Sequence, residues 1–226
     1  MTNKSYNENV VETYLLKQSK LRDYLCYKFI SPSNNGVPDR ILIGHGLVVF
    51  VETKRPKGVP RKLQEKIIEK MRQHGASVFV IDDKEGVLEL LDNILPNNPN
   101  YMTDNKDVAM LDYNGLMAIN ETTDDYIENA VETHLLKQSR LKNYLCYKFV
   151  SPSNNGVPDR ILIGHGLVVF VETKRPKGTP RKLQEKVIEK MRQHGAHVFV
   201  INNKEKTSIL LDNILPSEPN YVFNAQ

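Results

Sequence analysis

The chain has no tryptophan, only two cysteines, and no apolar run near the roughly 20 residues that cross a bilayer. The cysteines, Cys26 and Cys146, argue against a disulfide framework and suit a reducing cytosol, so we expect a cytoplasmic protein without a membrane partner. The polar segment 1–6 lacks the apolar core of an export signal, so no signal peptide is predicted. Without tryptophan or another stacking cluster, a site that stacks single-stranded bases is disfavoured.

The chain also lacks a strong charge of either sign. Its 31 Lys and Arg residues against 27 Asp and Glu residues leave a net charge of +4, which is too small to identify a nucleic-acid-binding protein. The length of 226 residues allows one large domain or two domains of roughly 100 residues. How the charge and the motifs are distributed along the chain is therefore more informative than their totals.

A repeat with an offset of 120 residues dominates the sequence. Asp39 recurs as Asp159 and Glu52 as Glu172, and between residues 10 and 96 the second copy differs at 15 of 87 positions. A period this long indicates a domain duplication, because the units of solenoid proteins span only about 20 to 50 residues. The repeat predicts a first domain at residues 1–100, an acidic linker at 101–122 and a second domain at 123–226.

The spacing of apolar residues predicts the same series of elements in each copy. In the first copy these are a helix at 8–24, strands at 26–30, 40–43 and 47–51, a helix from Pro60 to Gly75 with a buried stripe of Leu63, Ile67, Ile68 and Met71, a strand at 77–81, and a closing helix at 87–95. The central strands are apolar on both faces, as in a sheet covered by helices on both sides. This order predicts an α/β fold in which helices flank a mixed sheet.

A hairpin brings three charged residues together. If His45 and Gly46 form a two-residue turn, Asp39 faces Glu52 with Cβ atoms about 5 Å apart, whereas a three-residue loop would shift the pairing by one. Strand alternation places Lys54 on the same face as Glu52. Two carboxylates this close resist ionising together unless a cation lies between them, and such oxygen ligands suit Mg²⁺ or Mn²⁺. The alternative is an exposed ion pair that contributes under about 1 kcal/mol.

Three motifs in each copy resemble the VRR-NUC family, a branch of the PD-(D/E)xK nucleases. They are Gly36-Val37-Pro38-Asp39-Arg40, then Val51-Glu52-Thr53-Lys54-Arg55-Pro56, then Leu63-Gln64. The resemblance covers roughly residues 8–95 and 128–215. It implies two tandem restriction-endonuclease-like domains, each with the element order α-β-β-β-α-β-α, in a metal-dependent nuclease.

The resemblance also implies a role for each motif residue. It implies that Asp39, Glu52 and the backbone carbonyl of Thr53 bind Mg²⁺ or Mn²⁺, that Lys54 is the catalytic lysine, and that Gln64 contacts the scissile phosphate or its neighbour. The second copy keeps every one of these residues, so two active sites are expected: Asp159, Glu172, Thr173, Lys174 and Gln184.

The family further uses a glutamate on the first helix, for which the sequence offers two candidates. Glu8 and Glu12 lie one helical turn apart on the same face. The family pattern places aliphatic residues three and seven positions after the glutamate, and Val11 and Leu15 fit this pattern for Glu8. The resemblance therefore favours Glu8 and Glu128 as metal ligands, with Glu12 and Glu132 as the alternatives.

A run of cations leaves the predicted active site and enters the second helix. Such a run is often only a solvated face, but the N-terminus of a helix already favours phosphate. Contacts of this kind hold the DNA backbone without reading its sequence. The predicted DNA-binding residues are Arg55, Lys57, Arg61 and Lys62 in the first copy and Arg175, Lys177, Arg181 and Lys182 in the second.

Compact members of the family resemble Holliday-junction resolvases, which are small two-fold dimers with paired sites. We therefore expect a structure-specific DNA endonuclease and favour a resolvase that acts on branched or duplex DNA as a single-chain pseudo-dimer, with further self-association left open. One alternative is a repair nuclease for flaps or forks whose halves work independently. Another is a non-catalytic DNA-binding module. The resemblance suggests a phage or prophage protein in a bacterial host cell.

Overall fold

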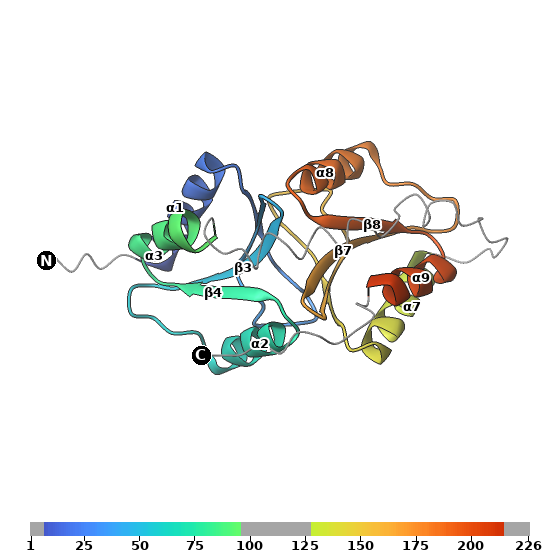
Figure 1. Cartoon of the computed structure of the whole chain (residues 1–226), viewed down its shortest axis with the longest axis horizontal. Coiled ribbons are helices and arrows are strands. Elements are labelled where there is room, and N and C mark those ends of the chain that lie inside the picture. Colours follow the sequence, from blue (N-terminus) through green and yellow to red (C-terminus); the bar gives the residue numbers. More distant parts are fainter. Residues whose placement is uncertain (1–6, 96–127, 215–226) are drawn as a thin grey trace, which may run out of the picture.

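The computed structural model describes residues 7–95 and 128–214, one stretch for each repeat, and the predicted linker at 101–122 lies outside them. No helix in these two stretches is long and apolar enough to cross a membrane. The first repeat contains α1 (Glu8–Leu21), β1 (Leu25–Lys28), β2 (Arg40–Gly44), β3 (Leu47–Thr53), α2 (Lys62–Gln73), β4 (Ser77–Ile81), α3 (Lys84–Leu88) and the π-helical segment η1 (Glu89–Ile94) (Figure 1). The second contains α7 (Glu128–Leu141), β5 (Leu145–Lys148), β6 (Arg160–Gly164), β7 (Leu167–Thr173), α8 (Lys182–Gln193), β8 (His197–Ile201) and α9 (Lys204–Ile214).

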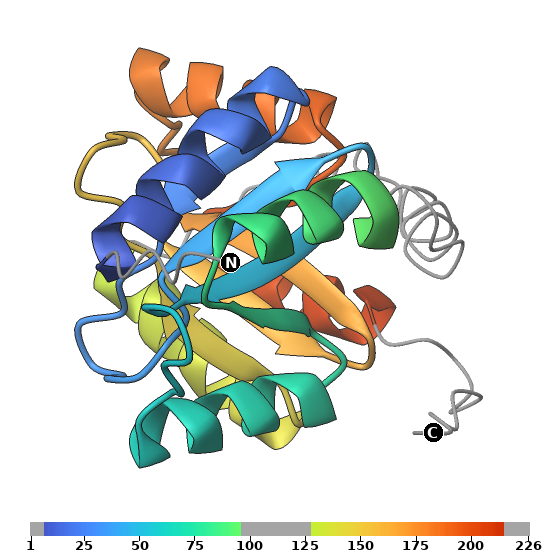
Figure 2. The same cartoon turned by 90° about the vertical axis from the view of Figure 1, so that its left-hand side faces the viewer.

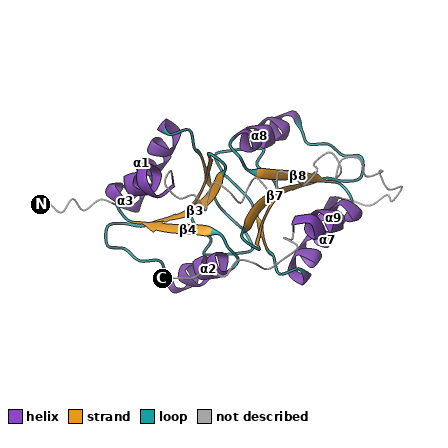
Figure 3. Ribbon diagram, in the orientation of Figure 1, coloured by secondary structure: helices purple, strands orange, loops and turns teal. Residues whose placement is uncertain are grey.

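Each repeat is built on a mixed four-stranded sheet, which confirms the predicted fold class (Figure 3). In the first repeat the order is β1-β2-β3-β4, with β3 and β4 parallel and the other pairs antiparallel. The hairpin pairs Gly44 with Leu47 and Arg40 with Val51, so the predicted two-residue turn is confirmed. His45 and Gly46 both have positive φ, at 54° and 81°, as this kind of turn requires.

The outer face of each sheet packs on the first and last helices of its own repeat. In the first repeat, Val11 and Leu15 of α1 pack with Leu42, Val49 and other buried residues of the sheet and the last helix. Figure 2 shows α1 and the α3–η1 segment side by side across this sheet. The helix α1 ends at Leu21, earlier than the predicted residue 24, because Asp23 adopts a left-handed φ of 59° and the chain turns there.

The inner face differs from the prediction, because helices alone do not cover it. The helix α2 covers part of this face, and the inner face of the other repeat covers the rest. Phe29 and Phe149 meet across the boundary with ring centroids 5.9 Å apart, and Ile30 and Val150 form an antiparallel bridge with two N–O distances of 3.0 Å. The two sheets therefore share one hydrophobic core in the middle of the molecule (Figure 1).

The hairpin turn of each repeat contacts the end of a helix in the other repeat. The backbone N–H of Gly46 donates to the carbonyl of His194 at 3.2 Å, and that of Gly166 donates to the carbonyl of His74 at 3.3 Å. These carbonyls lie at the C-terminal ends of α8 and α2, where helices leave carbonyls without intrahelical partners. Each repeat thus caps a helix of the other, and the same contact results when the repeats are exchanged.

The boundaries of two further helices differ from the sequence prediction. The helix α2 begins at Lys62 rather than Pro60, because the side chain of Gln64 accepts a hydrogen bond from the backbone N–H of Arg61 at 2.9 Å and caps the helix there. Leu63 is 51% exposed and does not belong to the buried stripe, whereas Ile68 and Met71 do. The last helix begins at Lys84 because the side chain of Asp83 caps it through the backbone N–H of Gly86 at 2.6 Å.

The glycines after α2 and α8 generate a test of the packing between the repeats. A Cβ atom on Gly75 would lie 2.4 Å from the Cα of Gly166, and one on Gly195 would lie 2.3 Å from the Cα of Gly46. Because backbone atoms cannot move aside cheaply, we expect Gly75→Ala with Gly195→Ala to lower the free energy of unfolding by several kcal/mol in a urea titration.

The matched control is Gly46→Ala with Gly166→Ala, since both glycines have a φ of +81° but open space where a Cβ would be added. This control should lose only about 1 kcal/mol per site, from backbone strain. Equal losses in the two double variants would show that the close approach between the repeats does not exist in solution.

Candidate active site

The end of the β2–β3 hairpin opposite its turn brings Asp39 against Thr53. One carboxylate oxygen of Asp39, Oδ2, accepts hydrogen bonds from the backbone N–H of Thr53 at 3.0 Å and from its hydroxyl at 2.9 Å. The carbonyl of Asp39 accepts from the backbone N–H of Phe29 at 2.8 Å, which fixes the main chain just before β2. In the second repeat, the N–H and hydroxyl of Thr173 donate to Asp159, both at 3.0 Å.

Glu52 and Lys54 form a buried ion pair beside Asp39. Glu52 is completely buried and Lys54 is only 8% exposed, and the ammonium of Lys54 contacts Oε1 of Glu52. The same ammonium donates to the carbonyl of Thr53 at 2.9 Å and lies 3.7 Å from a carboxylate oxygen of Glu8. The lysine ammonium therefore lies among oxygens that the family resemblance implied for a metal.

The pKa of the buried glutamate is displaced in both repeats. Burial raises the pKa of Glu52 to about 7, although the hydrogen bond from Lys54 opposes this shift. Burial, assisted by the charge of Asp159, likewise raises the pKa of Glu172 to about 7. The second oxygen of each carboxyl, Oε2, is buried and has no hydrogen-bond partner in residues 7–95 and 128–214. A cation beside this oxygen would satisfy it and favour the ionised form.

The oxygen atoms at this position fit a small divalent cation. Within the described residues, no three His, Cys, Asp or Glu side chains form a ready metal cluster. The candidate donors are the carboxylates of Asp39 and Glu52 and the carbonyl of Thr53, and the Lys54 ammonium contacts the last two of these residues. This is a partial set of hard oxygen ligands, and Mg²⁺ commonly completes such a set with water and phosphate oxygens.

Gln64 lies on the carboxylate of Glu52. Its side-chain amide donates to Oε1 of Glu52, while its own oxygen accepts from the backbone N–H of Arg61 at 2.9 Å. Gln184 makes the same two contacts, with Glu172 and with the N–H of Arg181. Gln64 therefore connects the start of α2 to the buried glutamate, and its contact with a phosphate stays a prediction.

The two glutamates of α1 have different partners. Glu8 approaches Lys54, and Glu128 approaches Lys174 with a distance of 3.8 Å. Glu12 instead pairs with Lys28 at 2.7 Å and with Arg40 at 2.8 Å. Of these two glutamates, it is thus Glu8 that approaches the buried ion pair, and its role as a metal ligand stays a prediction.

Lys28 and Arg40 are residues of the site that the sequence analysis missed. The ammonium of Lys28 lies 3.3 Å from Oδ1 of Asp39, on the side of the carboxylate away from Thr53. Lys28 also faces Arg40 directly across β1 and β2. The pairing of two cations on adjacent strands is the signal that could have found them, but it depends on the β1–β2 register, which no turn residue determines.

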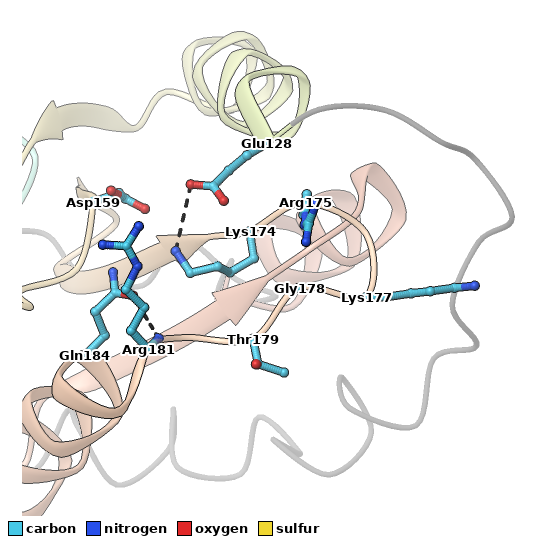
Figure 4. Close-up of a pocket in the computed structure, with 9 residues that line it drawn as sticks. All are labelled: Glu128, Asp159, Lys174, Arg175, Lys177, Gly178, Thr179, Arg181 and Gln184. Carbon is cyan, nitrogen blue, oxygen red and sulfur yellow. Dashed lines mark hydrogen bonds and ion pairs between the residues drawn. The ribbon is translucent and has the colours of Figure 1, made fainter.

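A pocket of about 540 Å³ opens over the site of the second repeat (Figure 4). Lys174 points toward Glu128 within it, and Gln184 and Arg181 approach from the start of α8. The predicted DNA-binding residues of both repeats are exposed, and three of them line this pocket, while Lys182 lies outside its lining. The complete lining consists of Glu128, Asp159, Lys174, Arg175, Lys177, Gly178, Thr179, Arg181 and Gln184.

The raised pKa values predict how stability depends on pH when metal is removed by EDTA. A carboxyl whose pKa rises on folding stabilises the folded state below its usual pKa, and this stabilisation is lost as the pH rises through about 7. We therefore expect the melting temperature to fall by several degrees between pH 5 and pH 8. Glu52→Gln with Glu172→Gln should remove most of this fall, since an amide does not ionise.

The control for this measurement is Glu65→Gln with Glu185→Gln, which replaces exposed glutamates at the starts of α2 and α8. It should keep the pH profile of the unsubstituted protein. Parallel profiles for all three proteins would contradict the assignment of the pH dependence to the two buried carboxyls.

Comparison with known proteins bears on the family of the chain. No known family model matches the chain. A protein described as "Putative nuclease p44", from Acyrthosiphon pisum secondary endosymbiont phage 1, is 38% identical over 86 residues, which are 37% of this chain and 90% of that protein. A solved structure described as "VRR_NUC domain" is 29% identical over 38% of this chain and 95% of its own, with a TM-score of 0.36. Because the identity extends over nearly the whole phage protein, and the VRR-NUC motif residues converge in both repeats, the chain belongs to the VRR-NUC nuclease family.

Proposed function

We propose that the protein is a divalent-metal-dependent DNA endonuclease that resolves four-way junctions as a single-chain pseudo-dimer. The observation that carries this proposal is the presence of two complete copies of the carboxylate–lysine site on repeats that contact each other reciprocally. A four-way junction offers two equivalent strands for incision, so two equivalent sites in a fixed relation suit it.

Asp39, Glu52 and the carbonyl of Thr53 would hold the metal in the first repeat, and Asp159, Glu172 and the carbonyl of Thr173 in the second. When bound there, Mg²⁺ or Mn²⁺ supplies an activated water and stabilises negative charge on the phosphate. The carboxylate of Asp39 accepts hydrogen bonds from Thr53, and that of Glu52 accepts one from Gln64. Both carboxylates are therefore oriented before any ligand arrives.

Lys54 would act on the phosphate once its ammonium leaves the carboxylate of Glu52. From that position it can donate to a non-bridging oxygen or orient the attacking water, and its burial keeps competing water away. Glu8, which has a carboxylate oxygen 3.7 Å from this ammonium, and its counterpart Glu128 would add a further oxygen ligand to each metal. The exposed cations at the start of α2 would hold the DNA backbone beside the site: Arg55, Lys57, Arg61 and Lys62.

The packing between the repeats supports paired incision. The inner faces share one core, and both hairpin tips are fastened to the opposite repeat. The two sites therefore cannot move apart as two domains on a flexible tether would. A fixed separation is what two incisions in one junction need, whereas a flap or fork nuclease needs only one site at a time.

The first experiment is the cleavage of a labelled four-way junction, a linear duplex and a 5′ flap, each with Mg²⁺ and with EDTA. We expect paired symmetric nicks on the junction alone, abolished by EDTA. Lys54→Ala with Lys174→Ala should still bind the junction and should lower its cleavage about 100-fold or more. If the flap were cut in preference to the junction, the proposed substrate would be a flap and not a four-way junction. An absence of any metal-dependent cutting would favour a non-catalytic DNA-binding module.

Single-site variants test whether the two repeats serve one junction. On a plasmid that extrudes a cruciform, two incisions give linear DNA and one incision gives a nicked circle. Lys54→Ala and Lys174→Ala, each alone, should yield mainly nicked circles, while the unsubstituted chain yields linear product. The two single variants are matched controls for each other. Linear product at the unsubstituted rate from either variant would contradict paired incision within one chain.

A further inference from the structure

A second network of charges lies beside Asp39 and is repeated in both halves of the chain. The ammonium of Lys28 lies 2.7 Å from Oε1 of Glu12 and 3.3 Å from Oδ1 of Asp39. In the second repeat, the ammonium of Lys148 lies 3.0 Å from Glu132 and 3.5 Å from Asp159. The same lysine thus bridges a glutamate of the first helix and the aspartate of the site in each repeat.

The network is anchored from a third element. Arg40 of β2 pairs with Glu12 at 2.8 Å, and it faces Lys28 directly across the β1–β2 pair. Like charges in directly opposed positions repel each other, and the carboxylate of Glu12 offsets that repulsion. The side chains of Arg40, Glu12 and Lys28 are 15%, 17% and 29% exposed, so solvent screens these charges only partly. The helix α1 therefore holds Lys28 in place against Asp39.

The contact with Lys28 completes the set of partners around the Asp39 carboxylate. Thr53 holds Oδ2 through its N–H and its hydroxyl, and Lys28 lies on Oδ1. With partners on both oxygens, the carboxylate has a preferred rotation about its Cβ–Cγ bond. We propose that Lys28 and Lys148 are positioning residues that orient Asp39 and Asp159 for a divalent metal and so determine how tightly each site binds it.

This inference rests on the proposed function, since it assumes that Asp39 and Asp159 are metal ligands. The positioning role differs from a direct contact between Lys28 and a DNA phosphate, because a positioning residue affects metal affinity even when no DNA is present. A lysine that contacts phosphate would instead change DNA affinity and its dependence on salt. The metal alone is therefore the probe that separates the two roles.

The test measures Mn²⁺ binding to the full chain without DNA, by electron paramagnetic resonance of the free ion. Lys28→Met with Lys148→Met keeps most of the side-chain volume but removes the charge and the donors. We expect the Mn²⁺ dissociation constant to rise about 10- to 100-fold, as is typical when a partner of a metal-binding side chain is lost. Lys28→Arg with Lys148→Arg should restore most of the affinity, because arginine can still donate to both carboxylates.

The matched control removes an ion pair of comparable position at the other end of α1 and α7. Arg22→Met with Lys142→Met breaks the pairs with Asp92 and Asp212, and it should leave Mn²⁺ binding unchanged. If the Lys28 and Lys148 double variant does not fold, Glu12→Gln with Glu132→Gln provides a second test. It keeps the helix side chain but weakens its hold on the lysine, and it should weaken Mn²⁺ binding to a smaller extent.

A kinetic measurement adds a readout that a general loss of structure would not give. In junction cleavage, the Mg²⁺ concentration for half-maximal rate should rise with the loss of Mn²⁺ affinity, while the rate at saturating Mg²⁺ stays within about threefold of the unsubstituted chain. Unchanged Mn²⁺ binding in the folded lysine variant would overturn the positioning role, even if DNA affinity fell. An unsubstituted chain that binds no Mn²⁺ would overturn the metal dependence in the proposed function as well.

Discussion

The two-residue turn at His45 and Gly46 sets which residues of β2 and β3 face each other. With Gly44 opposite Leu47, the last residues of β3 arrive beside Asp39, and the hydrogen bonds from Thr53 to Asp39 close this end of the hairpin. A slip of one residue would turn every side chain of the strand to the other face and would separate the carboxylates. The tip of the same hairpin is also the part that contacts the opposite repeat, through Gly46. One register therefore determines both the site and the packing between the repeats.

The ion pair inside each site is not explained by stability. Removing a carboxylate and an ammonium from water costs several kcal/mol for each ion, and a contact between them seldom offsets more than this. Glu52 also keeps a buried oxygen without a partner in the described residues, and burial raises its pKa to about 7. Such an arrangement is retained where a ligand makes use of it, and a divalent cation with a phosphate would satisfy both the free oxygen and the lysine.

The repeats are nearly identical, and their contacts follow from that identity. A surface that packs on its own copy forms the same contact twice, as the pairs Gly46–His194 and Gly166–His74 do. Small departures from the symmetry occur at the rim, where Asp23 lies 3.4 Å from His194 and the equivalent of Asp23 in the second repeat is Asn143. The motif residues Asp39, Glu52, Thr53, Lys54 and Gln64 recur unchanged in the second repeat, whereas one residue that lines its pocket, Thr179, replaces Val59.

The sequence by itself predicted the elements of each repeat and, given a two-residue turn at His45 and Gly46, the convergence of Asp39, Glu52 and Lys54, because strand alternation, turn residues and motif spacing act over short distances along the chain. Only the tertiary structure decided that the inner face of each sheet packs on the other repeat, that Glu8 rather than Glu12 approaches Lys54, and that Lys28 lies against Asp39. An apolar face predicts that the face is buried but not which surface covers it. An ion pair between α1 and the sheet depends on the angle at which the helix crosses the sheet. Both are settled by packing between distant segments, on which local patterns carry no information.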